Sequence, residues 1–440
     1  MSELVYLLNV GISGIKSIKK DVKLEFYKKT INSEFDPDKY RVKAIYGENG
    51  AGKSAIITAI KIFQDLIMKD HYLSEFKTQS FLDEIVNKES KKFSFNCEFL
   101  ADIGGARIVY YYGFVIAPNS EGIYELQSEI LKSKNGNYHN NNYKTIFETR
   151  QGVLECVDAE GDERENIFLK TFNLLSSNSF IYLYFMSVKS DTTGSMQLFI
   201  DMILSLILST CIKVYLGEED QHELYFLRKR LNDSSFDDSL LPDNLKDMAE
   251  SIRGLSSVSN KTVEKKHFEK YSENVARLTE FIKIFKSDLV SIDIDKKENG
   301  DNYECELNLN YGEYSINREF ESTGIKKLIR LFDCFSAASN GGIVFIDEMD
   351  SNLNDVYLCK LIEYFMYYGK GQLCFTTHNL DPMSVLKENK NSIDFLSSDN
   401  NLVSWVSRGN AIPENYYRNG MIEDLPFNID ATDFVGIFEE

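Results

Sequence analysis

Apolar and polar residues alternate over residues 4–46, in LVYLLNV, VKLEFY and RVKAIY, with the period of two that is typical of strands buried on one face. Residues 93–131 also predict strands, because FSFNCEFL, RIVYYYGFVI and IYELQSEIL are rich in aromatic and β-branched residues. Residues 53–68 instead place apolar side chains every three or four positions, which predicts a helix packed on a sheet. We therefore expect a strand, a loop and a helix in direct succession around residue 50.

The middle of the chain has a different pattern, with long segments that predict helices. These segments are residues 218–232, 241–255 and 262–292. A second strand-rich block follows from residue 290, and residues 323–338 predict another helix. Two short, almost uninterrupted apolar runs then occur in GGIVFIDEMD and QLCFTTHN, as is typical of parallel strands buried on both faces.

Together these elements predict an α/β fold in which mixed sheets are interrupted by a helical insertion. In this prediction residues 1–164 form an N-terminal lobe and residues 291–440 form a C-terminal lobe. Residues 165–290 form the insertion, with a role in dimerisation or partner binding. The parallel strands of the two lobes are expected to share one sheet.

One apolar segment, residues 198–216, approaches the length of a membrane span. Asp201 and Lys213 oppose that interpretation, because each costs roughly 2.5 to 3.5 kcal/mol near the centre of a bilayer. A helix buried within the protein is favoured, and a membrane span is the alternative. The N-terminus lacks the basic and apolar regions of a secretory signal, so we expect a cytoplasmic protein.

Charge and cysteine content narrow the functional classes further. The chain has 49 basic and 68 acidic residues, a formal charge of −19, which disfavours extended binding to a nucleic-acid backbone. Short basic clusters such as residues 16–20 are interpreted as solvated faces. The seven cysteines never occur as CxxC, so the pattern indicates neither a disulfide framework nor a zinc site and fits a reducing cytosol.

The loop before the first predicted helix reads GENGAGKS, which matches the pattern GxxxxGK followed by Ser or Thr. Small residues in this P-loop (residues 47–54) let successive backbone N–H groups wrap nucleotide phosphates. Lys53 would reach the β- and γ-phosphates, and the Ser54 hydroxyl would bind Mg²⁺. The other expected phosphate-binding residues are Gly47, Asn49, Gly50, Ala51 and Gly52. ATP and Mg²⁺ are therefore the predicted ligands, and an incidental flexible loop is the alternative.

Two carboxylates end the first of the apolar runs. Asp347 is suited to the Mg²⁺ shell, and Glu348 is suited to polarising the water that attacks the γ-phosphate. Acid pairs after strands are common loop openings, so the pair is informative only beside the P-loop. His378 ends the next run, where an imidazole could sense the γ-phosphate and hold the water. An ordinary surface histidine is the alternative.

With these motifs in this order, the chain resembles an ABC-type ATPase of the class that includes structural-maintenance-of-chromosomes proteins and Overcoming Lysogenization Defect enzymes. The resemblance covers residues 1–150 and 290–385 and is poor between them. It implies an AAA-family P-loop ATPase head, with the P-loop in one lobe and the signature, Asp-Glu and His motifs in the other. It also implies hydrolysis of ATP to ADP and phosphate, at a slow or partner-regulated rate.

The segment ESTGIKK, residues 321–327, resembles the signature loop of that family, although Thr323 stands where transporters carry glycine. The resemblance implies that Ser322 and Gly324 contact the γ-phosphate held by an opposing subunit. It therefore implies a homodimer of heads or a higher homo-oligomer. An ordinary helix cap at Ser322 is the alternative.

Two further positions have a counterpart in the family without a defined role here. Residues 351–354 resemble the loop that crosses the dimer interface, but Asn354 stands where relatives often carry histidine. Gln127 is a candidate for the glutamine that reaches Mg²⁺, and an exposed strand residue is an equally good interpretation. We assign neither residue to the site.

The segment IPENYYRNG, residues 412–420, resembles the tail of ATPase subunits in two-gene phage-defence systems such as PARIS, AbiL and Septu. That resemblance implies an ATPase that acts as sensor and scaffold, responds to a phage-derived trigger and controls a separate effector, a nuclease. The alternative is a DNA-repair or DNA-end-processing ATPase that works with a nuclease. A transporter subunit is a third interpretation, which the missing LSGGQ sequence opposes.

Overall fold

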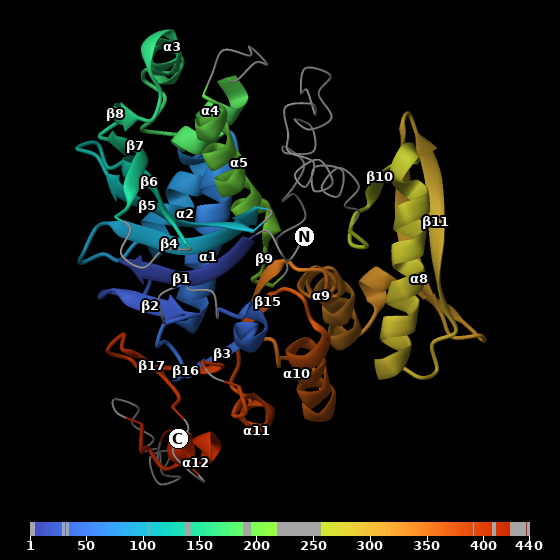
Figure 1. The fold of residues 1–440 in the computed structure, drawn as a ribbon. Helices are drawn as coiled ribbons and strands as arrows, with labels where there is room; N and C mark the ends of the chain where they lie inside the picture. The colour runs from blue at the N-terminus through green and yellow to red at the C-terminus, as the bar shows by residue number, and fades with distance from the viewer. Residues whose placement is uncertain are drawn as a thin grey trace.

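The computed structural model describes residues 5–28, 31, 35–103, 105–136, 142–187, 195–217, 257–389, 391–406, 411–422 and 437. The helices predicted at residues 218–232 and 241–255 lie outside these residues. The described strands form three sheets, of seven, six and four strands (Figure 1).

The seven-stranded sheet is antiparallel throughout and comes from the N-terminal part of the chain. Its strands, in spatial order, are β2 (Val22–Glu25), β1 (Val5–Ser13), β4 (Phe93–Ile103), β5 (Ala106–Pro118), β6 (Tyr124–Asn135), β7 (Lys144–Arg150) and β8 (Val153–Val157). Side chains of β4 alternate between buried and half-buried from Phe93 to Glu98, as the period of two predicts. The predicted strands of this region are thereby confirmed.

The six-stranded sheet collects strands from distant parts of the chain. In spatial order they are β17 (Leu402–Ser404), β16 (Ile393–Leu396), β3 (Val42–Gly47), β15 (Gln372–Thr376), β14 (Ile343–Ile346) and β9 (Ile212–Tyr215). All neighbouring pairs are parallel except β16 with β17. Every residue of β3, β14, β15 and β16 is buried, which is expected for a parallel sheet covered on both faces.

Helix α1 (Lys53–Met68) lies between these two sheets and is buried along almost its whole length. The Phe63 ring stacks on Phe95 of β4 at 4.8 Å between centroids. Helix α5 (Met196–Cys211) packs beside α1. The opposite face of the six-stranded sheet is covered by α9 (Thr323–Ser339), α10 (Asp355–Tyr368), α11 (Pro382–Leu386) and α12 (Pro413–Arg418). Successive residues of β14 therefore enter different cores, Ile343 beside α1 and Val344 beside α9.

The segment that the sequence analysis compared with a membrane span is largely a buried helix. The Asp201 carboxylate of α5 accepts a 2.6 Å hydrogen bond from Tyr110 within the protein. The helix ends at Cys211, because the next residues form β9 and pair with β14. In the part of the chain that the structure describes, no helix combines the length and apolarity needed to cross a membrane.

The four-stranded sheet consists of β10 (Thr262–Glu264), β12 (Asn302–Asn310), β11 (Ser291–Asn299) and β13 (Ser315–Asn317). Helix α8 (Phe268–Phe285) packs on it, and the helix and the sheet together form the right-hand part of Figure 1. The helix predicted over residues 262–292 was wrong at both ends. Thr262–Glu264 pairs with the edge of β12 instead, and the chain re-enters a strand at Ser291.

The described part of residues 165–290 contributes to both lobes. Helices α3 (Gly161–Thr171), α4 (Phe180–Ser187) and α5 lie on the N-terminal side, whereas β10 and α8 join the sheet of β11 and β12. The division at residues 164 and 290 stays a prediction. The remaining elements are α2 (Phe76–Ile85) and the short 3-10 helices η1 (Pro37–Tyr40), η2 (Tyr72–Ser74), η4 (Lys265–His267) and η5 (Arg318–Phe320).

Candidate functional site

Three loops meet at the carboxyl edge of the six-stranded sheet. The P-loop follows β3, Asp347 and Glu348 follow β14, and His378 lies two residues beyond β15. Strand β15 pairs in parallel with both β3 and β14, so all three strands end at the same edge. This is the edge at which open α/β sheets bind their ligands.

Two positions of the P-loop, Gly47 and Gly52, have a backbone geometry that favours glycine. A Cβ at Gly47 would lie 2.3 Å from the carbonyl oxygen of Leu396, so the neighbouring strand excludes any larger residue there. Gly52 has a φ of 111° and is the N-cap of α1, where it offers no side chain to the first helical amides. Those amides and the helix dipole make the start of α1 a site suited to an anion.

Lys53 extends back into the P-loop. Its Nζ donates to the carbonyl oxygens of Gly47 at 2.8 Å and Glu48 at 2.9 Å. Burial lowers the pKa of Lys53, and the charges of Asp347 and Glu348, in that order, oppose the shift. The ammonium group is therefore buried among acceptors and lies within electrostatic reach of the Asp-Glu pair.

Thr376, the last residue of β15, fixes the Asp-Glu pair. Its hydroxyl donates to Asp347 Oδ1 at 2.6 Å and accepts from the backbone N–H of Glu348 at 2.8 Å. Glu348 has a φ of 48°, an uncommon value for a residue with a side chain. The Glu348 side chain is exposed. One carboxylate is thus held against the sheet while the other is free to meet solvent.

His378 is tied to the same loops through Asp350. Its backbone N–H donates to Asp350 Oδ2 at 3.3 Å. Burial and then the charge of Lys53 lower the pKa of His378, and the nearby carboxylates oppose that shift. Burial and Lys53 therefore favour the neutral imidazole over the charged one. Asp350 Oδ1 is buried and has no hydrogen-bond partner among the described residues.

These interactions bring Lys53, Asp347, Glu348 and His378 together at one edge, although 325 positions separate the first from the last. Ser54, in the first turn of α1, follows Lys53 directly. Asn49 and Gly50 are exposed at the tip of the P-loop, and Ala51 is buried. The catalytic and binding roles given to these residues stay proposals.

Ser322 and Gly324 lie at the start of α9. Ser322 is the N-cap and accepts a 3.4 Å hydrogen bond from the N–H of Ile325, so the helix cap that was the alternative interpretation is observed. The signature role of Ser322 stays a proposal. Ser322 is also exposed, which a contact with a second subunit requires. Gly324 packs closely against the loop after Glu348, because a Cβ there would lie 3.0 Å from the Asn352 carbonyl oxygen.

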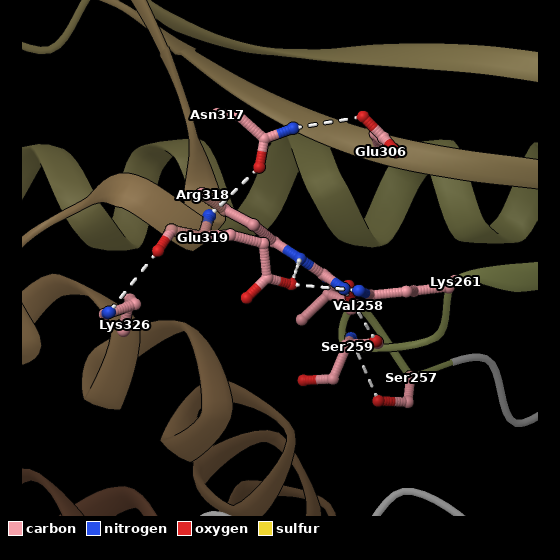
Figure 2. A network of polar contacts seen from close by, with 9 residues as sticks. All are labelled: Ser257, Val258, Ser259, Lys261, Glu306, Asn317, Arg318, Glu319 and Lys326. Carbon is pink, nitrogen blue, oxygen red and sulfur yellow. Dashed lines mark hydrogen bonds and ion pairs between the residues drawn. The ribbon is translucent and has the colours of Figure 1, made fainter.

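A polar network fixes the chain just before the signature loop (Figure 2). Buried Arg318 donates to the carbonyl oxygens of Val258 and Ser259, each at 3.1 Å. Glu319 pairs with Lys261 at 3.3 Å. Residues 257–261, which follow the undescribed part of the middle segment, are thereby held next to the start of α9.

Other residues named earlier have ordinary structural contacts. Asn354 caps α10 by accepting from the N–H of Val356 at 3.0 Å. Gln127 lies on β6, where its amide donates to Ala117 at 3.4 Å. No ligand role follows from either arrangement.

Three residues at the site were missed by the sequence analysis. Thr376 and Lys327 contact the loop of the Asp-Glu pair, and Lys16 donates to Thr58 of α1 at 3.0 Å. The charge of Asp347 raises the pKa of Lys16, against a larger lowering by burial. The three lysines of residues 16–20 are exposed, as a solvated face requires, and Lys16 also lies within electrostatic reach of Asp347. The only sequence feature that could have indicated Lys16 is the glycine-containing turn after β1.

Known proteins resemble this chain in two respects, a solved structure and a family model. A comparison with curated proteins gave no match. Solved structures that resemble the chain include the “recombination mediator protein RecF-ATPrS in RecFOR pathway”, at 13% identity and a TM-score of 0.38. That alignment covers 90% of this chain and 98% of the other.

The family model described as “AAA domain, putative AbiEii toxin, Type IV TA system” matches residues 43–381. The match runs from β3 to just beyond His378, so it includes every motif at the sheet edge. The chain belongs to this family of AAA-type P-loop ATPases.

Proposed function

We propose that the chain binds ATP with Mg²⁺ at the carboxyl edge of the six-stranded sheet and hydrolyses it. The observation that carries this proposal is the meeting of the P-loop, the Asp-Glu pair and His378 at one edge of the sheet, beside a helix N-terminus without a side-chain cap. Few arrangements other than a triphosphate site bring a buried lysine, a neutral imidazole and two carboxylates to a phosphate-binding loop.

The donor set fits the two ligands. Ser54 and Asp347 supply the hydroxyl and carboxylate oxygens that Mg²⁺ prefers. Bound Mg²⁺ would neutralise phosphate charge and polarise the γ-phosphoryl group. Lys53 would exchange its two carbonyl acceptors for phosphate oxygens. Glu348 would polarise the attacking water, and neutral His378 would orient it.

A second copy of the chain is proposed to complete each site. Ser322 is an exposed N-cap, and with the first amides of α9 it would form an anion site. This site would come from the predicted C-terminal lobe, whereas the P-loop comes from the predicted N-terminal lobe. In a head-to-head pair, each signature loop would contact the γ-phosphate held by its partner. Homodimer formation would then depend on ATP.

Replacing Ser322 by arginine is expected to prevent closing of the pair, because a long cationic side chain would fill the space needed by the partner's nucleotide. ATP should still bind to the single chain, while turnover should fall by at least about 100-fold. Nucleotide titration, phosphate release and molar mass by light scattering measure the three quantities. Ser315→Arg, at the exposed first residue of β13, is the matched control. Wild-type turnover by Ser322→Arg would remove the signature assignment.

We further propose that head closure controls a separate effector protein, a nuclease, in bacterial antiviral defence, as sensor and scaffold for a phage-derived trigger. The family description, which names a putative toxin and a type IV TA system, supports this setting. The formal charge of −19 favours a basic protein partner over a nucleic acid. We propose a cytoplasmic location, which the scattered cysteines without a CxxC spacing support.

This role is tested by expressing the chain together with the products of the adjacent genes. Retention of a neighbouring nuclease and the absence of DNA binding would support the effector-control proposal. DNA affinity that falls steeply with salt, without a retained protein, would instead favour a DNA-end-processing ATPase.

A further inference from the structure

Lys327 of α9 makes a set of contacts that the nucleotide chemistry above does not use. Only 5% of the residue is exposed, and its Nζ contacts four acceptors in one loop. These are the carbonyl oxygens of Glu348 at 2.6 Å, Ser351 at 2.7 Å and Met349 at 3.3 Å, and the Ser351 hydroxyl at 2.5 Å. All four belong to residues 348–351, which we call the base loop.

The base loop has a conformation that needs such support. Glu348 occupies the left-handed region, where a side chain is unfavourable unless the surroundings fix the backbone. Its N–H is bonded to the Thr376 hydroxyl, and its carbonyl oxygen accepts from Lys327. Both peptide groups that flank the Glu348 Cα are therefore held, which fixes the direction in which its side chain leaves the chain.

The helix that carries Lys327 also carries the signature loop. Ser322 caps α9 five positions before Lys327, a rise of about 7.5 Å along a helix. Gly324, between them, packs against Asn352, which directly follows the base loop. A displacement of the α9 N-terminus would therefore be transmitted to Glu348 through a rigid helical turn and a buried ammonium group.

We infer that Lys327 is a positioning residue that holds Glu348 in its working orientation and couples that orientation to contact at Ser322. This inference rests on the proposed ATP hydrolysis for its catalytic half. Its structural half, support of the base loop by Lys327, does not depend on turnover. A buried lysine that merely stabilises the fold is the competing explanation.

Lys327→Met removes the ammonium group and keeps an apolar chain of similar length. As a positioning residue, Lys327 acts on catalysis through Glu348. Loss of its ammonium group should therefore lower kcat by about 30- to 100-fold, while KM and ATP affinity change less than about threefold. Combined with Glu348→Gln, it should lower kcat by less than about twofold further, because both changes remove one function. Lys283→Met on the surface of α8 is the charge-matched control.

Hydrogen exchange without nucleotide tests the structural half. The amides of Glu348, Met349 and Ser351 have acceptors at 2.8, 3.0 and 3.1 Å, so their protection is measurable. Lys327→Met should speed their exchange at least about tenfold and leave α1 unchanged. If the wild-type chain failed to hydrolyse ATP, the proposed function would fail, while this measurement would still decide whether Lys327 supports the loop.

The inference is overturned if Lys327→Met retains wild-type kcat, if its effect adds fully to that of Glu348→Gln, or if exchange in the base loop is unchanged. Should Lys327→Met not fold, Ser351→Ala takes its place. That variant removes one acceptor and retains the buried ammonium group. It should lower kcat about threefold at constant KM and raise exchange in the base loop, and wild-type values for both would reject the inference.

Discussion

Glu348→Gln is expected to bind ATP normally and to hydrolyse it about 10²- to 10⁴-fold more slowly than the wild type. The amide has the size of the carboxylate but cannot accept a proton from the attacking water. The backbone bonds of Glu348 to Thr376 and Lys327 do not involve its side chain, so the loop should keep its shape. Closed pairs with trapped ATP should accumulate as a result.

Steady-state phosphate release and molar mass in the presence of ATP measure this outcome. Glu363→Gln, an exposed position of α10 that pairs with Lys360, makes the same chemical change away from the sheet edge. It should behave as the wild type. Normal hydrolysis by Glu348→Gln would show that another group activates the water.

Lys53→Ala is expected to abolish turnover and to weaken ATP binding by roughly tenfold to several hundredfold. Each charge-assisted hydrogen bond to a phosphate is worth about 1.5 to 3 kcal/mol, and the lysine would supply one or more. Among the described residues, the ammonium group is hydrogen-bonded only to Gly47 and Glu48 of its own loop. Its removal should therefore leave the nucleotide-free fold intact.

Calorimetric titration with ATP and Mg²⁺ gives the affinity, and thermal unfolding without nucleotide checks the fold. Lys69→Ala, just beyond the other end of α1 where Lys69 pairs with Asp65, is the control and should bind ATP with wild-type affinity. Unchanged ATP binding by Lys53→Ala would contradict the P-loop assignment.

Local sequence patterns predicted the helices and strands that are defined by the spacing of their own apolar residues. Helix α1 covers residues 53–68 as its apolar spacing indicates, and the buried runs at β14 and β15 form parallel strands. The P-loop, Asp347 and His378 could be grouped because each follows such a strand. The resemblance supplied Ser322 and Gly324, whose spacing alone indicates only a helix cap.

Contacts between distant parts of the chain determine the features that local sequence patterns did not predict. The apolar run of residues 198–216 has no turn signal, yet it changes from helix to strand at Ile212 because the edge of β14 offers backbone partners there. Thr262–Glu264 likewise joins a sheet whose other strands come later in the chain. The contacts of Thr376 and Lys327 depend on loops 28 and 21 positions away, so no local pattern indicated them.

A crystal structure of Glu348→Gln with ATP and Mg²⁺ would show whether the sheet edge is the nucleotide site. We expect Lys53 to contact the β- and γ-phosphates, Ser54 and Asp347 to bind the metal ion, and Ser322 of a second copy to face the γ-phosphate. Nucleotide bound elsewhere, or a triphosphate at the P-loop with Asp347 and His378 turned away from it, would refute ATP binding at this edge as proposed.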